Sequence, residues 1–546
     1  MPGEEFDFIV VGGGSAGCAL AARLSESGRH RVALVEAGPR DLNPWIHLPI
    51  GYGKTMWDPR FNWKFETEPE PTMHGRRIYW PRGKVLGGSS SINGLIAIRG
   101  QREDYDRWRD LGNPGWGFSD VFPYFLKLES NPDLAGTQEH GASGPIAVTS
   151  IKARHELIEA LIASAQANGI PRTNDFNGRI QEGVGYYQLT TRNGWRISAA
   201  QGYLRTARRR PNLVILTDAQ AIGISFDGRR ARAVAFVRKG RSETIRAQRG
   251  IVLSAGAIQT PHLLMLSGIG PREQLQRHGI TPLVDAPEVG QNLKDHLQVR
   301  LIYKCTKPIT TNDDLASFAG QVKIALQWLV KRSGPLAVGI NQGGLFARAL
   351  AGSATPDIQF HVATLSADMA GAKPHPFSGF TISVCQLRPE STGEIRLASA
   401  DPLVRPLIHA RYLTAPHDQA CITAGIRLAQ RIAATEPLAS YVKECLKPGP
   451  EATGDAQLLE FARATGATIF HPTGTCRMGS DAAAVVDPRL RVNGVDGLWA
   501  ADCSIMPDIV SGNTNLPAIM IGEKAADMML EDTAALAAPG GARRAA

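Results

Sequence analysis

Three glycines near the start of the chain have the spacing that a dinucleotide pyrophosphate requires. They are Gly12, Gly14 and Gly17, within the segment GGGSAG at 12–17. One glycine permits a tight turn, a second lets the backbone approach the pyrophosphate, and the third lets a helix and a strand pack closely. Glu36 follows 24 residues after Gly12, where a carboxylate accepts hydrogen bonds from ribose hydroxyls and disfavours a 2′-phosphate. This pattern indicates binding of FAD or NAD rather than NADP.

A second glycine-rich segment, GKVLGGSSSING at 83–94, offers backbone N–H groups and serine hydroxyls to an anion or to a flat polar ring. The core-type side chains of Val85, Leu86 and Ile92 interrupt the polar residues, which is not typical of a flexible linker. We therefore interpret this segment as a second contact with the cofactor.

The first glycines need a strand, a turn and a helix around them, and the sequence supplies all three. Residues 6–11 are β-branched and aromatic, residues 18–27 carry Ala and Leu at helical spacing, and residues 31–35 alternate into a second strand that ends at Glu36. The segments at 211–224 and 249–270 have a similar character. We predict a nucleotide-binding domain of the βαβ type that is discontinuous in sequence.

The middle of the chain differs from this pattern. Helical patterns occur at 321–332, 421–435 and 456–465, and alternating runs at 380–387 and 394–397. These indicate antiparallel strands with helices on one side. The predicted fold is of the α/β class, with a Rossmann-like cofactor domain and an α+β substrate domain whose antiparallel sheet is backed by helices. We assign 1–154, 212–311 and 469–535 to the cofactor domain, 155–211 and 312–468 to the substrate domain, and 536–546 to a disordered tail.

Composition excludes several other classes of protein. The 546 residues are 43% hydrophobic and 20% charged, which is typical of folded domains and not of a disordered chain. The net charge is +9, but the basic residues are scattered, so we expect no nucleic-acid partner. The seven cysteines lack metal-binding spacing, so we expect reduced thiols and no metal. Neither a signal peptide nor about 18 consecutive apolar residues is present. We expect a cytoplasmic protein without a transmembrane segment, with peripheral membrane association left open.

Four motifs together resemble the glucose-methanol-choline (GMC) family of FAD-dependent oxidoreductases. They are the 83–94 segment, GAIQTPHLLMLSGIG at 256–270, HPTGTCRMG at 471–479 and GLWAADCSIMPDIVSGNTNLPAIMIGEKAADMM at 497–529. The likeness runs from residue 6 to about 530, and it is greatest to the branch that contains choline dehydrogenase and bacterial FAD-dependent alcohol dehydrogenases.

The resemblance implies FAD extended across the first domain, with its isoalloxazine ring at the boundary with the second. Some members of the family attach the flavin through a histidine at the position of Ile92, so here we expect FAD to be non-covalent. The implied cofactor contacts come from both glycine-rich segments, the region near 255 and the C-terminal motif: Gly12, Gly14, Ser15, Ala16, Gly17, Glu36, Ala37, Arg82, Gly83, Val85, Gly87, Gly88, Ser89, Asn93, Gly94, Ala221, Ala255, Gly256, Asp502, Asn513 and Asn515.

Oxidation of an alcohol removes a proton from oxygen and a hydride from carbon, and histidine is a suitable base near neutral pH. The resemblance places His471 opposite flavin N5, so we predict that it is the catalytic base. We predict Asn515 as its partner, with an amide that donates to the substrate oxygen. Asn513 is the alternative, and either could instead cap the following helix, expected at 516–530. The positive end of that helix would stabilise reduced flavin.

The predicted reaction is oxidation of an uncharged primary alcohol to an aldehyde, with a quinone, a dye or oxygen as electron acceptor. A choline dehydrogenase, an oxygen-using alcohol oxidase, an NAD-dependent dehydrogenase, a non-oxidative FAD lyase and a non-catalytic flavin-binding protein remain alternatives. Choline would need an aromatic cage with a carboxylate. The sequence does not assign that cage, although four aromatic residues are candidates for an entrance: Trp45, Trp57, Trp63 and Phe65.

Overall fold

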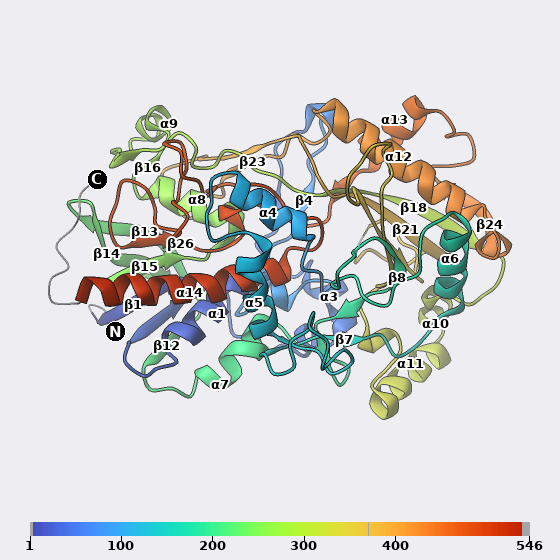
Figure 1. Cartoon of the computed structure of the whole chain (residues 1–546), viewed down its shortest axis with the longest axis horizontal. Helices are drawn as coiled ribbons and strands as arrows, with labels where there is room; N and C mark the ends of the chain where they lie inside the picture. Colours follow the sequence, from blue (N-terminus) through green and yellow to red (C-terminus); the bar gives the residue numbers. More distant parts are fainter. Residues whose placement is uncertain (1–3, 370, 538–546) are drawn as a thin grey trace.

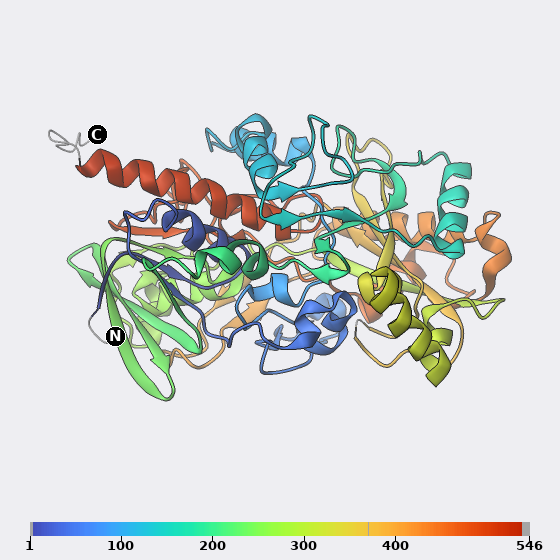
Figure 2. The same cartoon turned by 90° about the horizontal axis from the view of Figure 1, so that it is seen from below.

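Two large sheets lie side by side along the long axis of the protein, in a computed structural model that describes residues 4–369 and 371–537. The first sheet is on the left of Figure 1 and the second on the right, and Figure 2 shows the same arrangement from below. Together with the helices that cover them, the sheets confirm the predicted fold class.

The first sheet is parallel at its centre and carries an antiparallel hairpin at one edge. Its order is β12-β2-β1-β15-β14-β13, and β26 also pairs with β15. Val10 pairs with Leu34 on one side and Val252 on the other, and all three are fully buried, as in parallel strands covered on both faces. The strands are β1 (Glu5–Val11), β2 (Val32–Val35), β12 (Leu213–Leu216), β13 (Ala219–Asp227), β14 (Arg230–Arg238), β15 (Arg241–Leu253) and β26 (Leu498–Ala500).

Helix α1 (Ser15–Leu24) begins directly after the first glycine turn, as the sequence predicts. Gly12 has a φ of +102°, and a side-chain carbon at Gly17 would lie 1.9 Å from the carbonyl oxygen of Gly12. α1 packs along α14 (Asn515–Ala537), where Arg23 Nε donates to Glu523 Oε2 at 2.8 Å. The C-terminal helix therefore covers the first βαβ unit, and it is longer than the predicted 516–530.

The second sheet is antiparallel, with the order β24-β18-β21-β20-β19-β8 and with β25 paired to β18. Helices cover one of its faces: α12 contacts β21, α13 contacts β18 and α6 contacts β8. The elements are β8 (Gly183–Tyr186), β18 (Leu297–Cys305), β19 (Asn341–Ala347), β20 (Ile358–Ala363), β21 (Gly379–Gln386), β24 (Val442–Lys447), β25 (Ala467–Thr468), α6 (Glu156–Ala167), α12 (Pro416–Ala433) and α13 (Asp455–Thr465).

The two faces of this sheet have opposite character because side chains alternate along each strand. Val299 pairs with Val384, which pairs with Phe360, and all three are buried on the side of α12. The neighbouring row, Arg300 with Ser383 and His361, belongs to the other face. The second sheet thus has an apolar face under its helices and a polar face turned away from them.

Shorter elements complete the molecule. The segment from α2 to β4 lies at the junction of the two sheets (Figure 2).

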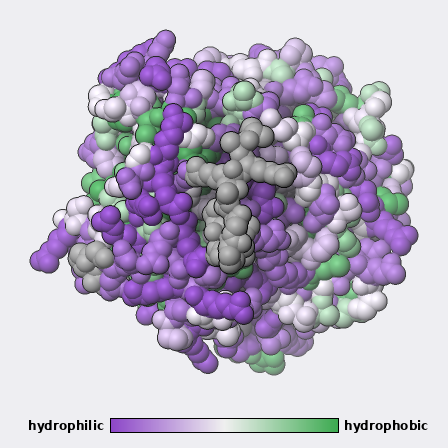
Figure 3. All heavy atoms as spheres, turned by 60° about the vertical axis from the view of Figure 1, so that its left-hand side comes forward, coloured by the Kyte–Doolittle hydropathy of each residue, from purple (hydrophilic) through white to green (hydrophobic). Residues whose placement is uncertain are grey.

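The face brought forward in Figure 3 is largely hydrophilic where visible, with hydrophobic residues scattered over it. No helix within 4–369 and 371–537 is long and apolar enough to cross a bilayer. The remaining helices, with β4, are α2 (Pro44–His47), α3 (Tyr52–Thr55), β4 (Tyr79–Trp80), α4 (Arg102–Asp110), α5 (Phe118–Leu128), α7 (Arg205–Ala207), α8 (Gly256–Leu266), α9 (Arg272–Arg277), α10 (Thr311–Ala316) and α11 (Phe318–Lys331).

Two predicted domain boundaries do not coincide with the sheets. β18 falls inside the predicted cofactor stretch 212–311 but pairs with β21 and β24 of the second sheet. Residues 200–204, predicted in the substrate domain, contact α1. Strand alternation reveals a strand but not its sheet, which explains the first difference; residues 200–204 form a short helix, whose local sequence does not show which domain it packs against. We propose a boundary near 296; the other limits stay predictions. α14 extends to Ala537, past the predicted start of the tail, and 538–546 lie outside the described residues.

Replacing Gly17 with Ala should destabilise the protein, because the new methyl group has no room beside the Gly12 carbonyl. We expect a loss of about 1–3 kcal/mol in the free energy of unfolding, the usual range for overpacking. Gly223→Ala in β13 is the matched control, since a side-chain carbon there meets nothing within 4 Å, and it should stay within about 0.5 kcal/mol of the wild type. Urea unfolding followed by circular dichroism tests this, and equal midpoints for both variants would contradict it.

Candidate active site

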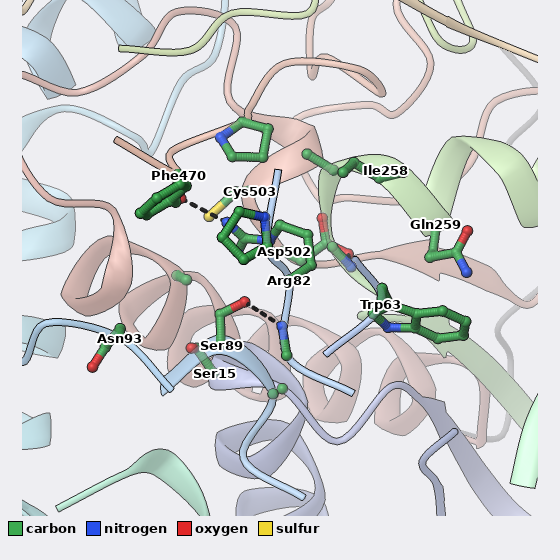
Figure 4. A pocket seen from close by; sticks show the side chains of 18 of the residues that line it. Ser15, Trp63, Arg82, Ser89, Asn93, Ile258, Gln259, Phe470, Asp502 and Cys503 are labelled. Carbon is green, nitrogen blue, oxygen red and sulfur yellow. Dashed lines mark hydrogen bonds between the residues drawn. The ribbon is translucent and has the colours of Figure 1, made fainter. Parts of the chain in front are cut away.

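A deep pocket lies between the carboxyl ends of the parallel strands and the polar face of the second sheet. Its walls include the residues that follow β1, β2, β15 and β26, together with Gln298, Arg300 and His361 from the second sheet. In open α/β sheets this edge is where ligands bind. Figure 4 shows Ser15, Ser89 and Asn93 near one another, with Arg82 between them and Phe470.

The pocket brings together most of the residues that the sequence predicted. Gly17, Val85 and Gly87 do not line it. Gly17 packs on the Gly12 carbonyl, Val85 is buried in an apolar cluster, and the Gly87 N–H donates to the Gly13 carbonyl at 2.7 Å. These three shape the loops. The predicted residues that line the pocket are Gly12, Gly14, Ser15, Ala16, Glu36, Ala37, Arg82, Gly83, Gly88, Ser89, Asn93, Gly94, Ala221, Ala255, Gly256, His471, Asp502, Asn513 and Asn515.

The first glycine turn leaves room for a phosphate. A side-chain carbon at Gly14 would meet only the Ser254 carbonyl oxygen, at 3.9 Å, and one at Gly94 or Gly256 would meet nothing within 4 Å. The residue before α1 provides no side-chain cap. The first N–H groups of α1 can therefore bind an anion, which the positive end of the helix also attracts. This cradle fits the pyrophosphate of a dinucleotide.

Glu36 is held at the end of β2 by two backbone N–H groups. Its Oε2 accepts from the Gly13 N–H and its Oε1 from the Gly38 N–H, both at 2.8 Å. Burial raises the pKa of Glu36 to about 7. The two hydrogen bonds act in the opposite direction, because they favour the charged form and lower the pKa. A carboxylate oxygen accepts more than one hydrogen bond, so ribose hydroxyls can also donate to this group. The arrangement fits the predicted adenosine end of the cofactor.

Asp502 joins the start of α8 to the C-terminal motif. Its Oδ2 accepts from the Thr260 hydroxyl at 2.6 Å and from the Gly256 N–H at 2.8 Å. Burial raises the pKa of Asp502. Arg82 donates to the Phe470 carbonyl oxygen at 2.6 Å (Figure 4), so it fixes the residue before His471. These contacts position the pocket wall around the predicted flavin.

Hydrogen bonds fix the tautomer of His471. His296 Nε2 lies 2.9 Å from the Leu387 carbonyl oxygen, which can only accept, so this nitrogen carries the proton. Burial lowers the pKa of His296 to about 4, so its Nδ1 is an unprotonated acceptor. His471 Nδ1 lies 3.0 Å from that atom and must donate to it. The Nε2 of His471 is therefore the proton-accepting nitrogen.

Asn513, and not Asn515, lies beside this nitrogen. Asn513 Nδ2 is 3.3 Å from His471 Nε2, and its Oδ1 accepts from Gln359 Nε2 at 3.1 Å, which fixes the orientation of the amide. Asn515 Oδ1 instead accepts from the Ser15 hydroxyl at 2.8 Å, between the starts of α1 and α14. The geometry thus favours the alternative that the sequence analysis gave, and it does not support Asn515 as the partner of His471.

Burial keeps the imidazole of His471 neutral. The side chain is 7% exposed, and desolvation, with His296 nearby, lowers its pKa well below the usual range. Its backbone N–H donates to Asp295 Oδ1 at 2.7 Å. His361, which the sequence analysis missed, also lines the pocket; neither of its ring nitrogens makes a hydrogen bond of good geometry, and burial lowers its pKa to about 3. The pocket therefore contains a neutral imidazole that can accept a proton and a second imidazole whose nitrogens have no well-formed hydrogen bond among the described residues.

Comparison with known proteins decides the family. Two family models described as GMC oxidoreductase match residues 6–298 and 389–522. The chain belongs to the GMC oxidoreductase family. It is therefore an oxidoreductase, and proteins of this family use FAD. Among the described residues no group of three or more His, Cys, Asp or Glu side chains could hold a metal ion.

Three relatives of this GMC oxidoreductase are informative. An alcohol dehydrogenase [acceptor] from Pseudomonas putida is 41% identical over 529 residues, which cover 96% of each chain. The mitochondrial choline dehydrogenase of Mus musculus is 40% identical over 535 residues, covering 96% of this chain and 89% of the relative. The solved structure of an Aspergillus oryzae RIB40 formate oxidase variant, studied for FAD modification, has a TM-score of 0.90 at 27% identity and covers 97% of this chain and 99% of that one.

The lowered pKa of His471 can be measured directly. With histidine labelled with 13C at Cε1, the resonance that disappears in His471→Gln should not move between pH 8 and pH 6, because an imidazole with a lowered pKa is neutral throughout that range. A histidine with an ordinary pKa of about 6.5 would shift strongly there. A titration of this resonance near pH 6.5 would disprove the neutral base.

Proposed function

We propose that this protein is an FAD-dependent dehydrogenase that oxidises a primary alcohol to an aldehyde. One observation carries the proposal: the proton-accepting Nε2 of His471 opens on the same pocket as glycine turns that fit a dinucleotide. The relatives named alcohol dehydrogenase and choline dehydrogenase support an alcohol as the donor. Turnover also needs an external electron acceptor, and a quinone, a dye or oxygen would each serve.

In this mechanism His471 Nε2 accepts the hydroxyl proton of the substrate, while its Nδ1–H continues to donate to His296. The amide of Asn513 donates to the substrate oxygen and orients it, which stabilises the developing alkoxide. When bound, FAD supplies the acceptor for the hydride that leaves the alcohol carbon. Burial disfavours the imidazolium that results, so the proton must leave His471 before the next turnover.

We assign Asn515 to cofactor binding rather than to proton transfer. Its contact with Ser15 and its place in the first turn of α14 support a role at the flavin, where the positive end of the helix would stabilise negative charge. The flavin is proposed to be non-covalent because Ile92, which lines the pocket, offers no atom for a bond to it.

Choline is less well supported as the substrate. The only acidic side chains that line the pocket among the described residues are Glu36 and Asp502, and backbone N–H groups already bind both. A quaternary ammonium group would leave water without a carboxylate partner. An alcohol without a positive charge therefore fits better.

Replacing His471 with Ala should slow anaerobic reduction of the flavin by alcohol about 10²- to 10⁴-fold, the usual effect of losing a general base. Asn513→Ala should slow it about 10²-fold, as for loss of one donor to a developing oxyanion. His74→Ala, a surface histidine paired with Glu460 at 2.7 Å, is the matched control and should reduce at the wild-type rate. Stopped-flow absorbance near 450 nm measures the rates, and near-normal reduction in His471→Ala would refute the assignment.

The purified protein should be yellow, and acid precipitation should release its flavin completely. This follows from the apolar side chain at position 92, which cannot bond to the cofactor. The measurement is the flavin absorbance of the supernatant and of the washed pellet. Flavin retained in the denatured pellet would contradict non-covalent binding, and a colourless protein that takes up no added FAD would contradict the cofactor itself.

A further inference from the structure

A second chamber adjoins the cofactor pocket on the side of the second sheet. The two cavities share Tyr52, Arg300 and Asn341 in their walls. The chamber continues between α3, the α10–α11 region and the polar face of β20 and β21. It therefore begins beside the pocket that contains His471 and leads away from the glycine turns, where a substrate would extend.

The charged side chains that line this chamber are all positive among the described residues. Arg300 and Lys54 are the only charged side chains that line it among the described residues. Acidic residues on the surrounding elements are paired elsewhere: Asp314 with Lys323 at 3.2 Å and Asp368 with Lys447 at 2.7 Å. A cationic ligand such as choline would meet repulsion here.

Arg300 carries a guanidinium with which none of the described residues pairs. Within the described residues its side chain makes no hydrogen bond, ion pair or ring contact, although the residue is only partly exposed and burial lowers its pKa. Lys54 differs, because its ammonium group stacks 3.7 Å from the centre of the Trp45 ring. Removing an unpaired guanidinium from water costs free energy. A bound carboxylate would offset this cost by accepting hydrogen bonds from the guanidinium, so Arg300 is suited to bind an anion.

The register of the sheet puts this arginine within reach of the reacting centre. Arg300 pairs with Ser383 and Ser383 with His361, so the three share one row and one face. Two strand spacings separate the α-carbons of Arg300 and His361 by about 10 Å. His361 lies in the cofactor pocket with His471. A chain of a few carbon atoms can connect the two positions.

We propose that the substrate is a hydroxycarboxylic acid whose carboxylate binds Arg300 while its terminal hydroxyl faces His471. The inference rests on the proposed alcohol oxidation and adds the substrate class. The hydroxyl proton passes to His471 Nε2, and two electrons leave the alcohol carbon as a hydride to FAD, so that an aldehyde acid forms. The carboxylate is unchanged in the reaction and serves only for recognition.

The test compares ω-hydroxycarboxylates of four to eight carbons with ω-hydroxyamides of equal length and with choline. At the best length, kcat/KM of flavin reduction should be at least about tenfold higher for the acid than for the amide, since a hydrogen-bonded charge pair contributes about 1.5 kcal/mol or more. Choline should reduce the flavin more slowly than either. Equal values for acid and amide at every length would overturn the proposal.

Variants of Arg300 test whether this residue causes the preference. Arg300→Gln should lower kcat/KM for the acid at least about tenfold more than for the amide, and Arg300→Lys should restore part of the preference because the charge returns. Arg427→Gln is the matched control, because Arg427 lies on α12 and pairs with Asp455 at 2.7 Å. Its kinetics should equal those of the wild type. Equal losses for acid and amide in Arg300→Gln would indicate a structural or flavin contact and would also overturn the proposal.

Binding provides a readout that is independent of turnover. Calorimetry should detect hexanoate binding to the wild-type holoenzyme at least about tenfold tighter than hexanamide, and Arg300→Gln should abolish this difference. If hexanoate binds in this way but no alcohol reduces the flavin, the proposed oxidation fails and the anion site stands. If neutral alcohols reduce the flavin and hexanoate does not bind, the oxidation stands and the anion site fails.

Discussion

The hydrogen bond from His296 to the Leu387 carbonyl oxygen is the constraint on which the chemistry of the site depends. A backbone carbonyl cannot donate, so His296 Nε2 must donate to it. His296 Nδ1 then accepts from His471 Nδ1, which leaves His471 Nε2 without a proton. Leu387 directly follows β21 of the second sheet, whereas His471 belongs to the segment that leads back to the first. The tautomer of His471 thus depends on the correct association of both parts of the fold.

Because side chains alternate along each strand of the second sheet, one face packs against helices and stabilises the fold, and the other face lines the cavities. Residues such as Val299 and Phe360 pack under α12, while Arg300 and His361, on the other face, line the cavities. Neighbouring positions on one strand therefore serve different purposes. Exchange of a side chain on the polar face changes what the cavity recognises and leaves the packed face under the helices intact.

The sequence predicted those parts of the site whose geometry is local. The position of Glu36 follows from one βαβ unit, and the motif around His471 pointed to the imidazole that we propose as the base. The choice between Asn513 and Asn515 could not be made locally, because the two lie in one short segment and differ only in the distant residues that they contact, His471 and Ser15. Arg300 was missed because a single polar residue in an alternating strand does not reveal which sheet contains the strand. Its spacing with Gln298 was the only signal.

The last part of the chain completes the first sheet and the site together. β26 pairs with β15, α14 covers α1, and the pocket residues His471, Asp502 and Asn513 all follow residue 470. During synthesis β15 and α1 therefore leave the ribosome long before β26, which pairs with β15, and α14, which covers α1, exist. Since domains begin to fold as they emerge, one side of β15 stays unpaired and α1 stays uncovered until residues 498–537 have been made. A chain that stops before residue 471 contains the first βαβ unit but lacks His471, Asp502 and Asn513, so under the proposed mechanism it cannot be partly active.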